Sequence, residues 1–133
     1  MARASYLVLA AFAALATVAS TPSFAASRAM RMLDTDHDGT INLQEATAAA
    51  MALFARLDHK HSGRLDAHEL RGRVNAFEFK AADSDHTGTL SKDEYLALVA
   101  QRFKRADKDN DGTIDEQELR STAGRSLQLL LRR

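Results

Sequence analysis

DTDHDGTINLQE, at residues 34–45, is the stretch of sequence on which the fold depends. Its pattern returns three more times in the 133-residue chain. The blocks begin 24, 25 and 24 positions apart, so 12, 13 and 12 residues separate consecutive blocks. Each gap therefore has room for one helix. The other blocks are DHKHSGRLDAHE at 58–69, DSDHTGTLSKDE at 83–94 and DKDNDGTIDEQE at 107–118.

The residue types in each block suit a hard cation. All four blocks have aspartate at the first place, glycine at the sixth and glutamate at the twelfth. Ca²⁺ takes about six to eight oxygen ligands, so alternate residues of a tight loop can direct oxygens inward while a late glutamate closes the shell. Clustered carboxylates repel one another unless a cation neutralises them. The blocks resemble the calcium loop of the EF-hand family, D-x-[DN]-x-[DN]-G-x5-E, with up to two departures, and the resemblance covers residues 26–133.

The resemblance implies an all-α fold of EF-hand helix-loop-helix repeats, in which short single helices join four calcium-type loops. It also implies which residues would hold Ca²⁺, the expected cofactor. The implied ligands are Asp34, Asp36, Asp38, Thr40, Asn42 and Glu45 in the first loop, Asp83, Asp85, Thr87, Thr89, Ser91 and Glu94 in the third, and Asp107, Asp109, Asp111, Thr113, Asp115 and Glu118 in the fourth.

The four loops are not equal in charge. The first offers four carboxylates and the fourth offers five, so we expect these two to bind Ca²⁺ best. The third keeps three, and we expect weaker binding there. The second is degenerate, because Lys60 stands at the third place and Ser62 at the fifth. Lys60 can instead act as an internal counterion to Asp58, Asp66 and Glu69, which predicts a loop held without metal.

Two features of the loops have a second interpretation. The ninth and twelfth residues, such as Asn42 and Glu45, also form capping boxes that start helices. All five histidines lie within the loops, and His59 and His61 flank Lys60, so a Zn²⁺ or Cu²⁺ site is an alternative there. We favour solvent-facing histidines, because the family tolerates any polar residue at the even places.

The gaps between the loops have helical patterns. Residues 46–57 are alanine-rich, and 95–106 place apolar side chains on one face. The middle gap, 70–82, is weaker because it contains Gly72 and Asn75, although Leu70, Val74, Phe77 and Phe79 supply an apolar face. Phe54, Phe79 and Phe103 each stand four residues before a loop, with Met30 in the corresponding first position, and we expect them in the core.

The short connectors predict how the loops pair. A single connecting helix places consecutive loops at its opposite ends, about 20 Å apart. We therefore expect the first loop to pair with the third, with Ile41 near Leu90, and the second with the fourth, with Leu65 near Ile114. A broken helix that lets neighbouring loops pair is the alternative.

Residues 1–25 have the pattern of a secretory signal peptide. Arg3 precedes an apolar run at 6–19, and Pro22-Ser23-Phe24-Ala25 ends in small residues suited to cleavage after Ala25. An uncleaved membrane anchor is the alternative, but the run is shorter than the roughly 20 residues that span a bilayer. We expect a periplasmic or secreted protein without stable membrane anchoring after cleavage. The apolar tail at 127–133 is expected to close the core.

The composition argues against several classes of function. Eighteen basic and eighteen acidic residues give no net charge, so we do not expect nucleic acid as a partner. The absence of cysteine excludes disulfides and thiolate chemistry. We expect a non-enzymatic, calcium-binding protein in which Ca²⁺ stabilises the fold or is buffered. The alternative is a calcium sensor that exposes an apolar groove to a protein partner, whose identity stays open.

Overall fold

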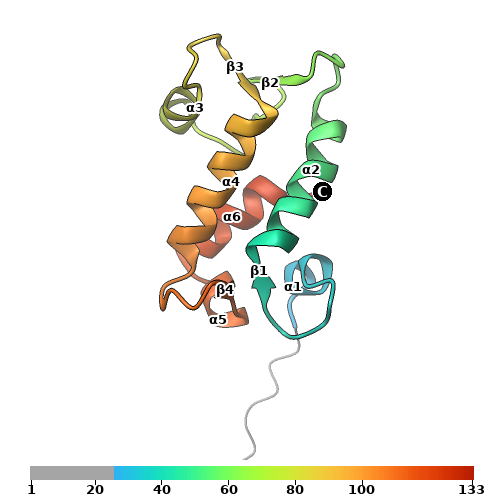
Figure 1. Cartoon of the computed structure of the whole chain (residues 1–133), viewed down its shortest axis with the longest axis vertical. Coiled ribbons are helices and arrows are strands. Elements are labelled where there is room, and N and C mark those ends of the chain that lie inside the picture. The colour runs from blue at the N-terminus through green and yellow to red at the C-terminus, as the bar shows by residue number, and fades with distance from the viewer. Residues whose placement is uncertain (1–25) are drawn as a thin grey trace, which may run out of the picture.

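The computed structural model of the chain describes residues 26–133, which are mostly helical. These residues form six helices and four short strands (Figure 1). In chain order the elements are α1 (Arg28–Leu33), β1 (Ile41–Asn42), α2 (Leu43–Leu57), β2 (Arg64–Asp66), α3 (Ala76–Ala82), β3 (Thr89–Ser91), α4 (Lys92–Ala106), β4 (Thr113–Ile114), α5 (Glu116–Leu119) and α6 (Thr122–Leu131).

The first, third and fourth loops each end one helix and start the next, whereas the second ends α2 and leads into turns. Helix α2 begins after Asn42, whose side chain accepts the Glu45 backbone N–H, while the Glu45 side chain accepts the Asn42 N–H. Ser91 and Glu94 form the same capping box at the start of α4. These reciprocal bonds satisfy N–H groups that the first helical turn leaves without partners. Asp115 and Glu118 form the same capping box at the start of α5, so the capping interpretation of the ninth and twelfth places is correct at these three loops.

The loops pair differently from the sequence-based expectation. Ile41 lies opposite Ile114 in the antiparallel pair β1 and β4, and Leu65 lies opposite Leu90 in the pair β2 and β3. The first loop thus pairs with the fourth and the second with the third. The expected pairing of Ile41 with Leu90 and of Leu65 with Ile114 is wrong. Figure 1 shows one pair at each end of α2 and α4.

The cause of this difference is the middle connector, residues 70–82 between the second and third loops, which is not a single helix. Residues 67–74 form turns, in which Gly72 takes a φ of 73°, and α3 begins only after Asn75 caps it by accepting the Glu78 N–H. A positive φ suits glycine and stops a helix. The chain therefore turns back, and the third loop stays beside the second. Phe77, expected on the apolar face of this connector, is 83% exposed.

Two arginines hold the turn of the middle connector. Arg73 donates from Nη1 to the carbonyl oxygens of Leu129 and Leu130 near the end of α6. Arg102, on α4, donates to the carbonyl oxygen of Arg73 over 2.9 Å. Since the last carbonyls of a helix lack partners within the helix, the Arg73 contacts also cap α6.

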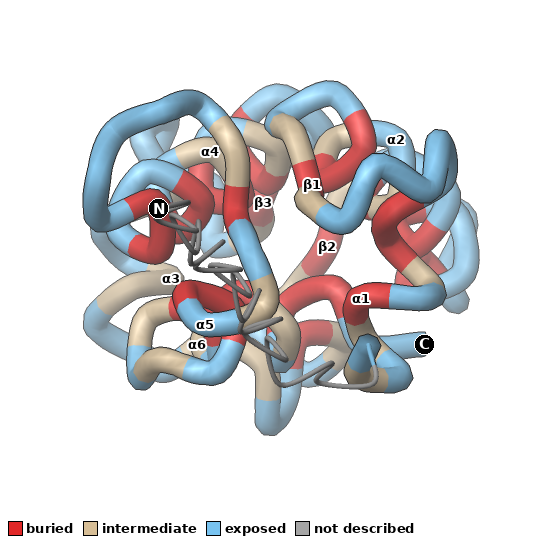
Figure 2. The backbone as a smooth tube through the Cα atoms, turned by 90° about the horizontal axis from the view of Figure 1, so that it is seen from below, coloured by how far each residue is buried: buried red, intermediate tan, exposed pale blue. Residues whose placement is uncertain are grey.

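The core lies among α2, α4 and α6, because α4 packs against both of the other helices. Figure 2 shows buried segments along the helices and strands and exposed backbone through the loops. Phe54 contacts Tyr95 with ring centroids 5.7 Å apart. As expected, Met30, Phe54 and Phe103 are buried, whereas Phe79 is only partly buried. The tail closes the core through the buried residues Leu127, Leu130 and Leu131.

The predicted signal peptide at 1–25 lies outside the described residues and stays a prediction. Within residues 26–133, no helix is both long enough and apolar enough to pass through a bilayer.

Candidate metal centres in the loops

The first-place aspartate organises each loop through the backbone. Asp34 accepts the N–H groups of Asp38 and Gly39 over 3.2 and 3.0 Å. Asp107 accepts those of Asp111 and Gly112 in the same way. At the sixth place Gly39 and Gly112 both have a φ of 89°, in the left-handed region that glycine enters at little cost. The first and fourth loops, far apart in the sequence, therefore have the same backbone conformation.

The fourth place of every loop also has a positive φ. His37, His61 and His86 have φ values of 62°, 52° and 54°, and Asn110 has 57°. Histidine and asparagine are enriched in this region relative to most residues. These histidines thus have a local backbone role. In the described part of the chain, no clustered set of metal-ligating side chains includes a histidine.

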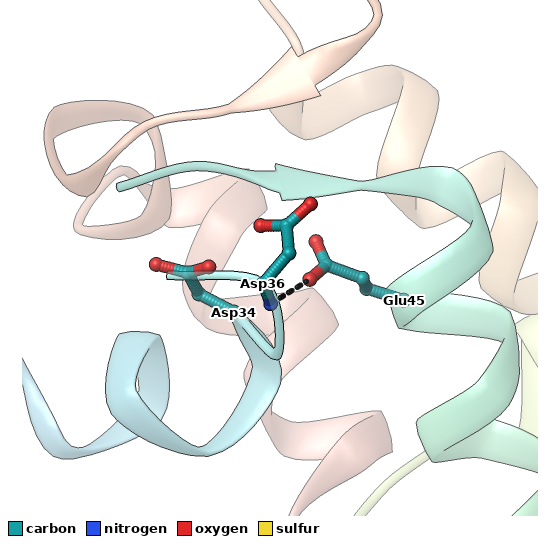
Figure 3. A group of neighbouring side chains, drawn as sticks. All are labelled: Asp34, Asp36 and Glu45. Carbon is teal, nitrogen blue, oxygen red and sulfur yellow. Dashed lines mark hydrogen bonds between the residues drawn. The ribbon is translucent and has the colours of Figure 1, made fainter. Parts of the chain in front are cut away.

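Three of the loops gather carboxylates around one point. Ligand oxygens of Asp34, Asp36 and Glu45 lie within 4.8 Å of one another, and Figure 3 shows these side chains within the first loop. The first, third and twelfth residues of the other two loops form equivalent groups. These groups are Asp83, Asp85 and Glu94 in the third loop, and Asp107, Asp109 and Glu118 in the fourth.

The other predicted ligands contact their own loop. Asp38 accepts both the N–H and the hydroxyl of Thr40 over 2.8 Å, and Asp111 accepts the same two groups of Thr113. Asn42, Ser91 and Asp115 accept backbone N–H groups as helix caps. The structure thus brings the first, third and twelfth places together, whereas the fifth place bonds within a local turn and the ninth caps a helix.

The electrostatics of the first and fourth loops favour a cation. A backbone hydrogen bond from Asp38 lowers the pKa of Asp36, but desolvation and repulsion from Asp38 and Glu45 outweigh it and raise that pKa. The pKa of Asp109 is raised in the same way, since desolvation and neighbouring carboxylates outweigh the bond from Asp111. A bound cation would relieve this repulsion. The oxygen-only donor sets therefore fit Ca²⁺.

The second loop contains its own cation. The Lys60 ammonium contacts Asp66, and this hydrogen bond is the main cause that lowers the pKa of Asp66 to about 2. Asp58 still accepts the N–H groups of Ser62 and Gly63, so the backbone turn matches that of the other loops. Lys60 thus pairs with Asp66 as the sequence suggested, while Asp58 bonds to backbone instead.

Sequence reasoning missed a residue of the second loop that contacts the third loop. Arg64, at the seventh place of the second loop, forms an ion pair with Asp85 over 2.9 Å. The Thr87 hydroxyl and then the Arg64 guanidinium lower the pKa of Asp85 against the opposing effect of desolvation. The sequence does mark Arg64 as unusual, because the other three loops have threonine at the seventh place.

Comparisons with known proteins agree with the repeat. The EF hand family model matches residues 28–45, 51–74 and 98–121. These matches contain the first, second and fourth loops, whereas the third loop lies outside them. A search of curated proteins found no match.

Proposed function

From three segments that match the EF hand model, and so support an EF-hand calcium-binding family, we propose that this chain binds Ca²⁺ chiefly to stabilise its own fold. The first and fourth loops are the principal sites. The observation that carries the proposal is that each groups three carboxylates within 4.8 Å, while repulsion helps to raise the pKa of the third-place aspartate. Ca²⁺ would supply charge neutralisation there.

The pairing of these two loops supports a structural role for the ion. β1 and β4 join the first loop, near one end of the described chain, to the fourth loop near the other. Ions that neutralise both loops would favour the state in which the strands are paired. A ligand at ten times its dissociation constant adds about 1.4 kcal/mol of stability per site by mass action.

We further propose that the protein is exported, either to a periplasm or into the medium. The pattern of residues 1–25 supports this location. Calcium sites of extracellular modules have dissociation constants near about 10⁻⁴ to 10⁻³ M, so sites of this kind are filled where calcium is abundant. A filled site transmits little information, which favours a stabilising role over a signalling one. We propose no catalytic residue, because the loop carboxylates are engaged with their own backbone.

The sensor alternative requires a groove that a partner can enter, and a groove of about 610 Å³ lies between α1 and α6. Its lining is mixed, because Met32 and Leu129 are among its apolar residues and it also includes Gln128 and four arginines. A partner helix with apolar and acidic side chains would complement this lining. The four arginines are Arg28, Arg125, Arg132 and Arg133.

Calcium titration of the full chain, by calorimetry and amide NMR together, tests the proposal. Gly39 and Gly112 donate their N–H groups to the first-place aspartates, so their amide signals report the first and fourth loops separately. We expect saturable heat with both signals shifting. Titration with KCl to the same ionic strength is the control for nonspecific charge screening. A chain in which neither glycine signal responds to millimolar Ca²⁺ would refute the proposal.

A further inference from the structure

One guanidinium nitrogen of Arg64 lies inside the oxygen cluster of the third loop. Its Nη2 is 2.9 and 3.1 Å from the carboxylate oxygens of Asp85, 2.7 Å from the Thr87 hydroxyl and 3.1 Å from the Thr89 carbonyl oxygen. It is also 3.4 Å from Oε2 of Glu94. These residues hold the third, fifth, seventh and twelfth places of the loop. Since one such nitrogen carries only two N–H groups, five surrounding oxygens form a shell around a charge rather than a simple hydrogen-bonded pair.

The strand pairing explains how Arg64 reaches this position. In the register of β2 and β3, Arg64 lies opposite Ser91 at the edge of the third loop. Its Nε also donates to the Thr89 hydroxyl over 2.6 Å, which fixes the direction of the side chain. Arginine is always charged and presents a planar fork of donors, so it suits an array of oxygens.

The other loop pair has no equivalent contact among the described residues. The seventh-place residues of the first and fourth loops are Thr40 and Thr113, and each hydroxyl donates to the fifth-place aspartate of its own loop. The second and third loops differ in charge as well, because Lys60 neutralises Asp66. Two cations of the second loop therefore face the carboxylates of this pair.

We propose that Arg64 is a built-in cation of the third loop, which holds the second and third loops together without metal and competes with Ca²⁺ for the third site. This inference rests on the proposed calcium binding and adds a hierarchy to it. The first and fourth loops depend on the ion for positive charge. In the second and third loops, Lys60 and Arg64 supply positive charge from the chain itself. Ca²⁺ enters the third loop only when the guanidinium leaves Asp85 and Glu94.

The test is a calcium titration of the full chain and of Arg64→Thr, which gives the second loop the seventh-place residue of the other three. Gly88 donates its N–H to Asp83 over 2.9 Å, so its amide signal reports the third loop. We expect the calcium midpoint at Gly88 to fall about tenfold or more in the variant, since hydrogen bonds to a charged group no longer oppose the ion. The midpoints at Gly39 and Gly112 should stay unchanged.

Melting in the presence of a chelator gives a second readout. Without metal, Arg64→Thr should melt at a lower temperature than the parent chain, because Asp85 and Glu94 lose their counterion. Saturating Ca²⁺ should remove the difference. Lys60→Gln is the matched control, since it removes a cation of the same loop that contacts Asp66 and should leave the Gly88 midpoint unchanged. If Arg64→Thr does not fold in chelator, the uncharged but longer side chain of Arg64→Gln gives the same comparison.

The outcomes separate the two proposals. If Gly39 and Gly112 respond to Ca²⁺ but the Gly88 midpoint is the same in the parent and both Arg64 variants, the role of Arg64 is refuted and calcium binding stands. If no glycine responds in any of these chains, calcium binding and the competition are both refuted. If Lys60→Gln lowered the calcium midpoint at Gly88 as much as Arg64→Thr does, the specific role of Arg64 would also be refuted, because the loss of any positive charge would explain the result.

Discussion

Arg102 Nη2 lies 2.9 Å from Oε2 of Glu78, and this ion pair ties α4 to α3. The Arg102 side chain is only 3% exposed. The same guanidinium donates to the carbonyl oxygens of Arg73 and Ser126, so one side chain joins the middle connector, α4 and α6. Because the broken connector sets which loops pair, Arg102 supports the topology of the whole described chain.

Arg102→Met should destabilise the protein by about 2–4 kcal/mol, because Glu78 loses its nearest cation and the carbonyl groups of Arg73 and Ser126 lose a buried donor. Urea unfolding measures the change. Arg105→Met is the control, since Arg105 also faces Glu78 but at 3.8 Å and with a 58% exposed side chain. Its effect should stay within about 0.5 kcal/mol. Equal effects of the two substitutions would contradict the assigned role of Arg102.

Asp34→Ala and Asp107→Ala should each remove one binding event from a calcium titration by calorimetry. Each substitution deletes the first-place ligand and the acceptor of two loop N–H groups. Asp58→Ala is the matched control, because Asp58 makes the same backbone bonds in the loop that contains Lys60. We expect it to remove no event. Loss of a binding event in Asp58→Ala would show that Lys60 does not prevent binding.

Chelation should lower the melting temperature of the parent chain markedly, because the first and fourth loops then keep uncompensated carboxylates. Calorimetric melting with and without chelator measures the shift. A fluorescent dye that binds apolar surface distinguishes the sensor alternative in the same samples. An equally stable chelated protein that gains dye fluorescence on addition of Ca²⁺ would favour the sensor.

Asp66 should titrate at a pKa of about 2, and Lys60→Gln should return its pKa toward the ordinary value of 3.8. The pKa is lowered in the folded protein, so the associated stability is present above about pH 4 and is lost as the pH falls toward 2. NMR titration of the Asp66 carboxyl carbon measures both values. An unchanged pKa in the variant would show that the ion pair does not form in solution.

The repeat was sufficient to predict the loops and the long helices. The residues at 46–57 and 95–106 lie within α2 and α4, and the first, third and twelfth places of three loops do gather their carboxylates. These features depend on residues close together in sequence, whose spacing sets a local turn or a helical face.

The pairing of the loops could not be derived from the same local pattern. It depends on whether the middle connector continues as a helix. The low helix propensities of Gly72 and Asn75 argue against a helix, but the apolar face of the same segment argues for one. In the structure, Gly72 lies in the turns and Asn75 starts a new helix. The role of Arg64 was hidden for the same reason, since its contacts lie in the loop across the strand pair.

The two strand pairs are nested, which has a consequence for the order in which the chain folds. β2 and β3 close a short segment, and β1 and β4 close a longer one that contains it. Closing the inner segment first shortens the effective distance that the outer pair must bridge, and so reduces its entropic cost. We expect the amides of Leu65 and Leu90 to gain protection from hydrogen exchange before those of Ile41 and Ile114 during refolding. During synthesis, which proceeds from the N-terminus, β2 and β3 can therefore pair before β4, the partner of β1, has been made.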